Sequence, residues 1–188
     1  IGRLWREDSV TYAGKHFRLQ DASIAPRPTR DDLPMWIGGG TEAAIRRTAR
    51  YGTGWQAGAE LPADAGRIVA AIKAAAAEIG RTIDEDHYGA AFPFHFGARD
   101  SAVVSGAMAA YAKRTGRDPT NYFAVGDADT ILDRIAEYVA VGVEKFILRP
   151  VGPDGETVIA QTRQLVETVL PRVAARWPRP SRRLDRGA

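Results

Sequence analysis

The sequence predicts an α/β protein whose strands run parallel. Short apolar segments alternate with longer amphipathic segments along most of the chain, a pattern typical of sheets whose strands are joined by helices. Two joins, 51–55 and 141–146, lead from a helix through a glycine into a strand within a few residues. Joins this short imply right-handed crossovers between parallel strands. Two architectures fit, a doubly wound sheet and an eightfold barrel, and the 188 residues fall short of the ~250 of a complete barrel.

The composition is that of a folded, cysteine-free protein. The chain is 45% hydrophobic and 26% charged, which supplies enough apolar material for a core of ordinary size. The lack of cysteine excludes a disulfide scaffold, a cysteine nucleophile and thiolate zinc sites. It also suits the reducing cytoplasm, where we expect this protein. No apolar run approaches the ~18 residues of a membrane span, so we expect no membrane partner.

Basic charge gathers at the carboxyl end. The net charge is +3, but the segment from Arg172 onward holds six arginines and one aspartate, which leaves about −2 on the rest of the chain. Residues 177–188 combine arginine with proline and show no periodicity, so we expect a disordered basic tail that aids solubility. Binding of nucleic acid by this tail is the less favoured alternative. It predicts salt-dependent binding that is lost when residues 178–188 are deleted.

The first part of the chain predicts a helix end and a hairpin. Residues 1–7 read as the last turns of a helix that begins upstream. Segments 10–12 and 16–19 then flank Ala13-Gly14-Lys15 as the two strands of a hairpin. Prolines at 26, 28 and 34 mark an irregular connection to the part that follows.

Strands and helices alternate through the remaining chain, each helix with apolar residues on one face and most with a glycine at the end. The predicted strands are 35–37, 54–57, 87–96 (interrupted at Pro93) and 145–148. The predicted helices are 41–51, 62–79, 101–115, one capped by Asp127 or Asp129 and stopped at Gly142, and 157–176. Segment 122–125 is expected to be an irregular extended piece.

The turn after the first of these strands predicts an anion-binding site. A buried strand runs into Gly38, Gly39 and Gly40, and Thr41 opens a helix. Glycines let backbone amides approach a ligand, and a helix N-terminus adds unpaired N–H groups with a partial positive charge. A plain turn capped by Thr41 is the alternative, although three glycines exceed what a cap needs. The pattern is neither a Walker loop nor the Rossmann fingerprint.

Three further residues stand at strand ends. Arg149 follows the last strand, where a barrel delivers residues to its active-site face, and it suits a phosphate, a carboxylate or a reduced-flavin anion; a structural ion pair is the alternative. His95 lies between phenylalanines, and we consider both a catalytic acid–base role and a packed structural role. Gln56 is placed to line a planar ring. No histidines or carboxylates show metal-ligand spacing, so the sequence predicts no metal site.

An ordered series of segments resembles the bacterial luciferase-like oxidoreductases, and it covers nearly the whole chain up to about residue 175. These segments are 10–19, 26–28, 33–39, 43–55 and 125–149. The resemblance implies a TIM (β/α)8 barrel of which residues 1–176 form the second half, with strands five to eight between 35 and 149. It places a group of residues against the cofactor at the ends of strands five, six and eight. These residues are Gly38, Gly39, Gly40, Thr41, Gln56, Ala57 and Arg149.

The resemblance also implies an activity. Members of the family are oxidoreductases or monooxygenases that use reduced FMN or the deazaflavin coenzyme F420 on small organic substrates, and segment 88–94 looks like the deazaflavin members. The protein would position the cofactor ring and shield it from water. The alternative is a non-catalytic flavin-binding or half-barrel assembly protein, and redox turnover of the cofactor separates the two. Half a barrel leaves a strand edge open, so we expect a homo-oligomer.

Overall fold

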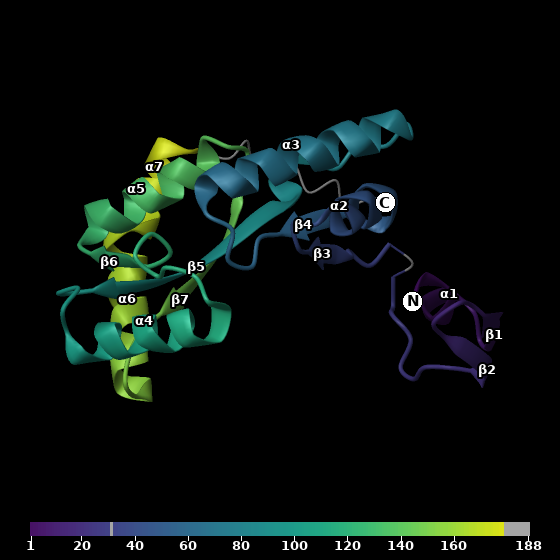
Figure 1. The fold of residues 1–188 in the computed structure, drawn as a ribbon, viewed down its shortest axis with the longest axis horizontal. Helices are drawn as coiled ribbons and strands as arrows, with labels where there is room; N and C mark the ends of the chain where they lie inside the picture. Colours follow the sequence, from purple (N-terminus) through teal and green to yellow (C-terminus); the bar gives the residue numbers. More distant parts are fainter. Residues whose placement is uncertain (31, 179–188) are drawn as a thin grey trace, which may run out of the picture. The chain divides into compact units, whose positions relative to one another are not determined.

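The computed structural model describes residues 1–30 and 32–178 (Figure 1). Most of the predicted basic tail, residues 179–188, lies outside the described residues, so the expectation of disorder there stays a prediction. The internal contacts of the chain divide into two units, Ile1–Met35 and the part from Trp36 onward. The sequence predicted one domain over residues 1–176.

The first unit is a short helix followed by a hairpin. Helix α1 covers Gly2–Arg6, and β1 (Val10–Ala13) pairs antiparallel with β2 (Arg18–Ala22). The predicted hairpin is therefore confirmed. Val10 is its buried residue, and a lone pair of strands with so little buried surface is marginally stable by itself.

The second unit is built on a parallel sheet of five strands. They are β3 (Trp36–Gly38), β4 (Gly54–Gln56), β5 (Tyr88–Phe96), β6 (Ala124–Gly126) and β7 (Lys145–Pro150). The carbonyl of Gly89 accepts a hydrogen bond from Ala57 N at 2.8 Å, and that of Tyr88 accepts from Glu144 N at 2.9 Å. Successive carbonyls of a strand point to opposite edges, so β4 and β7 flank β5 on either side. The parallel α/β fold predicted from the sequence is confirmed.

Two details of this sheet differ from the prediction. Segment 122–125 is not simply irregular, because β6 pairs with the last residues of β5, from Phe94 to Phe96. Pro93 does not interrupt β5 either. On the edge of β5 that its missing N–H would face, β4 ends opposite Gly89 and β6 begins opposite Phe94. The proline therefore lies in a gap between two partners, where no hydrogen bond requires its N–H.

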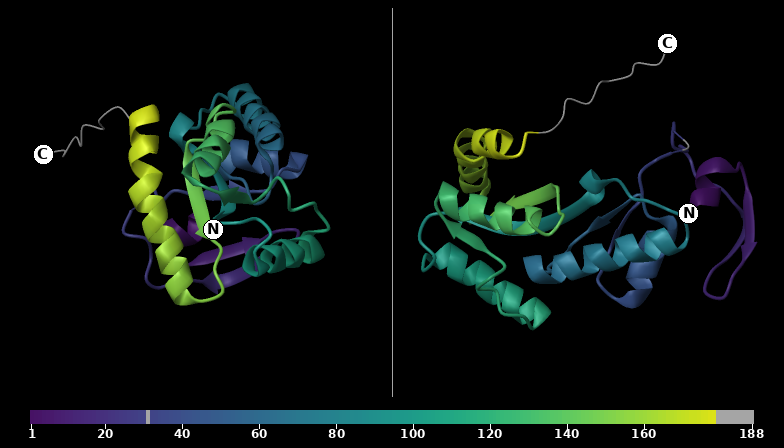
Figure 2. Two further views of the ribbon diagram at one scale, coloured as in Figure 1. Left: turned by 90° about the vertical axis from the view of Figure 1, so that its left-hand side faces the viewer. Right: turned by 90° about the horizontal axis from the view of Figure 1, so that it is seen from above.

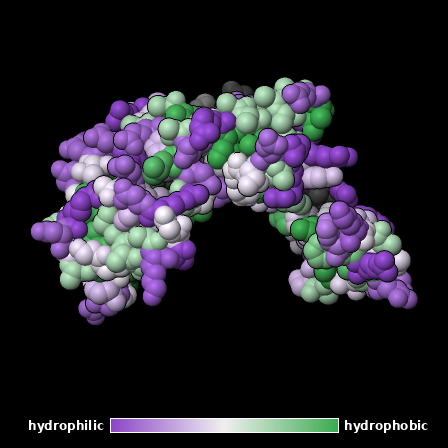
Figure 3. Space-filling view, viewed as in Figure 1, coloured by the Kyte–Doolittle hydropathy of each residue, from purple (hydrophilic) through white to green (hydrophobic). Residues whose placement is uncertain are grey.

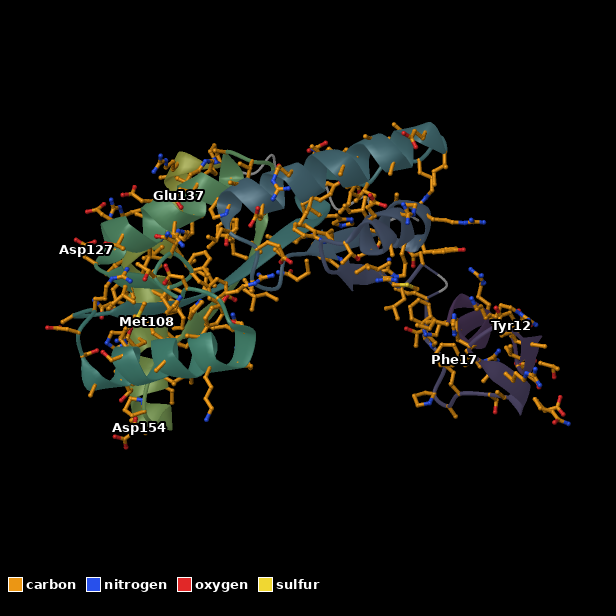
Figure 4. The ribbon with its side chains drawn as sticks, viewed as in Figure 1. Tyr12, Phe17, Met108, Asp127, Glu137 and Asp154 are labelled. Atoms are coloured by element: carbon orange, nitrogen blue, oxygen red, sulfur yellow. The ribbon has the colours of Figure 1, made fainter. Side chains whose placement is uncertain are left out.

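Six helices surround the sheet, counted over the described residues. They are α2 (Glu42–Tyr51), α3 (Pro62–Glu78), α4 (Ala102–Thr115), α5 (Ala128–Val139), α6 (Gly155–Thr168) and α7 (Leu170–Arg176), and a 3-10 turn spans Glu85–His87. Asp127 caps α5 and Asp154 caps α6, each accepting from a backbone N–H three residues on (Figure 4). No helix in the described ranges is long and apolar enough to cross a membrane.

The prediction of a single last helix over 157–176 is wrong. The structure breaks it between Thr168 and Leu170, and the chain changes direction between α6 and α7 (Figure 2). Pro171 has no N–H to bond the carbonyl four residues earlier, and its ring crowds that carbonyl. Proline is tolerated at the start of a new helix, which is where α7 places it.

Different helices cover the two faces of the sheet. Side chains of paired residues in parallel strands point to the same face. On one face Phe92 stacks on Tyr138 of α5 with ring centroids 5.8 Å apart, and Phe146 packs edge-on against both rings. We call this the α5 face. The opposite face carries Pro93 and Arg149, and α4 lies over it (Figure 1); we call it the α4 face.

Towards the amino ends of the strands the α4 face is less covered. Trp36 lies across Gly54 and Gly89, since a Cβ added to them would come within 2.6 and 3.0 Å of its ring. Ile147 of β7 is 53% exposed on the same face. Among the described residues β3 pairs only with β4 and β7 only with β5, so these strands do not close a barrel.

Candidate functional site

The glycine turn, residues 38–41, joins β3 to α2. Gly39 has a φ of +96°, a conformation that favours glycine, and its carbonyl accepts from the indole N–H of Trp55 at 3.0 Å. Thr41 Oγ1 accepts from Ala44 N at 3.3 Å, which is the N-cap that the alternative of a plain turn expected. The first N–H groups of a helix have no partner within it, and residues 38–43 are exposed. The turn can therefore offer backbone N–H groups to a ligand.

Gln56 stands at the end of the neighbouring strand. The register of the sheet places Gly38, Gln56 and Gly89 side by side on the α4 face. Gln56 Nε2 donates to the carbonyl of Ala57 at 3.1 Å. Its Oε1 lies over Gly89, where an added Cβ would come within 2.4 Å of it. The open part of this surface is therefore Gly38 and the amide of Gln56, while Gly89 is covered by Gln56 and Trp36.

Glu60 connects the loop after β4 to the glycine turn. Its Oε2 accepts from Gly58 N at 2.7 Å and from Ala59 N at 3.1 Å. Its Oε1 lies 3.7 Å from the position that a Cβ on Gly40 would take. A carboxylate that accepts two backbone N–H groups is held in place, so its negative charge lies beside the turn.

Tyr122 connects the same loop to Arg149. Tyr122 Oη donates to the carbonyl of Gly58 at 2.8 Å and accepts from Nη2 of Arg149. The guanidinium lies 5.8 Å from the centre of the Tyr122 ring, and Tyr111 stacks on that ring at 4.6 Å. Burial raises the pKa of Tyr122, while the positive charge of Arg149 acts in the opposite direction. The phenol of Tyr122 therefore stays protonated at neutral pH and can donate a hydrogen bond to the carbonyl of Gly58.

These contacts form a continuous line at the carboxyl ends of the strands. It runs from the glycine turn through Glu60 and residues 57–61 to Tyr122 and Arg149. The structure thus places the predicted residues Gly38, Gly39, Gly40, Thr41, Gln56 and Ala57 at one end of this line and Arg149 at the other.

His95 lies apart from the glycine turn along the sheet. It is six residues further along β5 than Gly89, the partner of Gln56, or roughly 20 Å at ~3.3 Å per residue. Its Nδ1 donates to the carbonyl of Val151 at 2.8 Å, and its side chain is 8% exposed. This bond ties β5 to the segment after β7, which accounts for its burial. A catalytic role for His95 stays a prediction.

One cluster of the described residues has the atoms of a metal site. Ligand atoms of Asp84, Asp86 and His87 lie within 4.8 Å of one another, at the amino end of β5. His87 Nδ1 donates to Thr53 O at 2.8 Å, and Asp86 lies 3.6 Å from Nζ of Lys145. Both groups thus already have protein partners, at the end of the sheet opposite to the glycine turn. We assign no metal to it.

Sequence reasoning missed Glu60 and Tyr122. Glu60 follows three small residues at the end of a strand. A lone carboxylate in such a loop could have marked it as a candidate site residue. Tyr122 stands in a segment without apolar periodicity, and its partner Gly58 is 64 positions away. Nothing local indicates that contact.

Comparison with known proteins identifies the family. The family model of the luciferase-like monooxygenases matches residues 1–124. An F420-dependent glucose-6-phosphate dehydrogenase of Microbacterium testaceum (strain StLB037) is 25% identical over 202 residues, and the match covers 94% of this chain and 59% of that relative. This chain therefore spans about six-tenths of the relative's length.

Solved structures share the fold. A monooxygenase from Streptomyces bottropensis superposes with a TM-score of 0.71 at 18% identity, covering 92% of this chain and 58% of that one. A type II Baeyer–Villiger monooxygenase from Pseudomonas putida in complex with FMN gives a TM-score of 0.64 at 16% identity, covering 90% and 60%. The family model covers more than half of the residues, so the resemblance seen in the sequence is confirmed. The chain belongs to the luciferase-like monooxygenase family.

Proposed function

We propose that this chain binds a reduced flavin or deazaflavin and forms part of the active site of an oxidoreductase that acts on a small organic molecule. One observation carries the proposal: the continuous line of contacts from the glycine turn to Arg149 at the carboxyl ends of parallel strands. Ligands of α/β folds bind at that end. The oxidoreductase names of the relative and of the solved neighbours support it.

For the architecture, we propose that β3, β4, β5 and β7 correspond to strands five to eight of a TIM barrel, with β6 as an additional short strand. Their parallel pairing and the neighbours of the same fold support this assignment. The share of the relative that the chain spans, 59%, is what a second half with some flanking sequence would give. Strands one to four would then complete the active site.

The residues at the site fit such a cofactor. Gly38 is exposed and leaves room for a flat ring on the α4 face, and Gln56, whose side chain covers Gly89, can bond the polar edge of that ring. The N–H groups of the glycine turn and the hydroxyl of Thr41 suit a phosphate or another polar group of the cofactor tail. Glu60 would repel an anion from its own side of the turn, which restricts the direction of approach.

The chemistry divides between cofactor and protein. A bound reduced cofactor supplies hydride transfer, or oxygen activation in the case of FMN. Arg149 holds an anionic part of the cofactor or substrate with a fork of N–H donors. Tyr122 keeps that fork in one orientation, since it accepts from Arg149 while it donates to Gly58. The protein's contribution is thus binding, orientation and exclusion of water.

For the cofactor, we favour the deazaflavin F420. The relative that matches 94% of this chain bears the name of an F420-dependent enzyme. FMN is the alternative, supported by the solved neighbour that holds it. A second candidate function is a half-barrel that binds the cofactor or another copy without turnover, which the exposed Ile147 favours. Oxidation of the reduced cofactor in the presence of substrate distinguishes an enzyme from such a protein.

The first prediction concerns cofactor binding to the glycine turn. A Cβ at Gly38 would lie 3.4 Å from the carbonyl of Gln56, so Gly38→Val should fold but occupy the space of the ring. We expect it to weaken F420 or FMN binding at least tenfold in a fluorescence titration. Gly155→Val is the matched control, because nothing lies within 4 Å of its Cβ position. Gly39 is a poor choice, since its φ of +96° strains any other residue.

Arg149 provides a second variant for the same titration. A charge-assisted hydrogen bond is worth about 1.5–3 kcal/mol, so Arg149→Ala should weaken binding about tenfold to a hundredfold. Arg149→Lys should recover only part of this, because lysine lacks the planar fork. Failure of the unaltered protein to bind either cofactor would contradict the proposed function. Wild-type cofactor affinity in both Gly38→Val and Arg149→Ala would show that the cofactor does not bind at this site.

A further inference from the structure

A pocket beneath α4 opens beside the line of contacts described above. Its volume is about 220 Å³, below the ~300–1,000 Å³ of pockets for drug-sized ligands. Its floor is the α4 face of the sheet at Pro93, Arg149 and Val151. Its wall is one stripe of α4, in which Ala107, Tyr111 and Arg114 are spaced as residues of one helical face.

The helix α4 presents small residues on this side. Met108, labelled in Figure 4, lies on the side of α4 towards the sheet and packs against the core. In Figure 3 the surface over α4 mixes pale green residues with purple ones, and the helix itself combines several alanines with two basic residues in its last turn. Small side chains on a helix that packs over a sheet leave space between them, and that space is the pocket.

Two arginines line this small pocket. Within residues 1–30 and 32–178, neither Arg114 nor Arg149 forms an ion pair with a carboxylate, whereas Arg134 and Arg172 do. Arg149 uses one N–H on Tyr122, and a guanidinium has five such donors. Two cations at one pocket repel each other, and an anion between them removes that cost.

The rest of the pocket is apolar or aromatic. Pro93, Ala107 and Val151 expose hydrocarbon, and the stacked rings of Tyr111 and Tyr122 close one side. A ligand that fills it therefore has an apolar body as well as an anionic group.

We propose that this pocket binds a small organic acid, with its carboxylate between Arg114 and Arg149 and its apolar body against Tyr111 and Ala107. Arg114 lies in the last turn of α4, where the helix dipole presents partial negative charge. That field opposes a dianionic phosphate more than a monoanionic carboxylate. Identification of the acid as the substrate rests on the function proposed above.

The test is calorimetric titration of the protein with benzoate, benzamide and phenyl phosphate. Benzamide has the shape of benzoate without its charge. We expect benzoate to bind at least tenfold more tightly than benzamide, and Arg114→Gln and Arg149→Gln each to remove about tenfold or more of that affinity. Arg163→Gln, an exposed arginine of α6 outside the pocket, is the matched control and should bind as the unaltered protein does.

Each other outcome has a defined meaning. The proposal that this pocket binds an organic acid is overturned if benzoate and benzamide bind equally. It is also overturned if Arg114→Gln binds benzoate normally. Tighter binding of phenyl phosphate overturns the choice of a carboxylate. A cofactor titration of the same samples separates this proposal from the proposed function, because Arg114→Gln should leave cofactor affinity unchanged. If the unaltered protein binds benzoate but neither cofactor, and Arg114→Gln loses the benzoate affinity, the pocket is supported and the proposed function is contradicted.

Discussion

At the scale of single residues, Tyr88 is a phenol buried without a hydrogen-bond partner. Its side chain is fully buried on the α5 face, and its Oη has no partner among the described residues. Burial raises the pKa of Tyr88 to about 12, against about 10 for an exposed tyrosine. The folded protein therefore holds this proton more tightly than the unfolded chain does.

We predict that Tyr88→Phe makes the protein more resistant to alkaline pH. The unfolded chain releases the Tyr88 proton near pH 10 and the folded state near pH 12, so this residue costs stability progressively as the pH rises between them. At pH 7 the variant should be equally stable or better by up to about 1 kcal/mol, since no hydrogen bond is lost. Urea unfolding at pH 7 and near pH 11 measures both effects. Tyr51→Phe, at an exposed position, is the control, and a parallel alkaline loss in Tyr88→Phe and the unaltered protein would contradict the prediction.

The residue scale also shows what sequence can predict about the site. The glycine turn and Arg149 could be selected as candidate site residues because each stands at the end of a strand. In a parallel sheet the direction of the chain then places them at the same edge. Tyr122 was not identifiable, because its role depends on a contact with Gly58, 64 positions away. For His95 the sequence left a catalytic and a packed role open. Its observed bond to a backbone carbonyl fits the packed role, and the catalytic role stays a prediction.

At the scale of elements, two helical glycines have opposite surroundings. Gly106 lies inside α4 with nothing within 4 Å of its Cβ position. Gly66 lies inside α3, where an added Cβ would come within 2.9 Å of the Cβ of Val141. The effect of alanine on stability should therefore follow helix propensity at Gly106, whereas at Gly66 it should follow the tight packing against Val141.

We predict stability changes of opposite sign for alanine at these two positions. Gly106→Ala should raise the free energy of unfolding by about 0.5–1 kcal/mol, because alanine loses less backbone entropy in a helix. Gly66→Ala should lower it by about 1–3 kcal/mol, because α3 must shift away from Val141. Urea unfolding of both variants measures this, and each serves as the control for the other. Equal changes in the two variants would show that packing between α3 and Val141 is not as tight as the structure indicates.

The boundaries of elements were predictable where local signals and packing agree. Glycine stops and apolar faces located the strands and helices of the second unit to within a few residues. The failures came where the environment determines the outcome. Pro93 is compatible with β5 only because β4 and β6 leave a gap beside it, and β6 exists only through pairing with the end of β5. Pro171 was a local signal for the helix break before it, but the apolar periodicity of 157–176 favoured one continuous helix.

At the scale of the whole molecule, the sheet has edges that nothing among the described residues pairs. The outer edges of β3 and β7 are free of strand partners in the described part of the chain. The α4 face beside them carries Trp36, which is only partly buried, and Ile147, which is 53% exposed. Unpaired edges next to exposed apolar side chains favour association with further strands. In the proposed barrel, strands one to four would be such partners.

We predict that the purified chain self-associates through this region. Sedimentation velocity over a range of protein concentrations should show dimers or larger species in exchange with the monomer. Ile147→Lys should shift the distribution towards monomer, because a buried lysine without a partner is costly at such an interface. Ile159→Lys is the matched control, since Ile159 is 60% exposed and lies on helix α6 rather than on a strand of the sheet. A stable monomer at every concentration would contradict the prediction, and so would an equal response to the two lysine variants, because the association would then not depend on the exposed part of the α4 face.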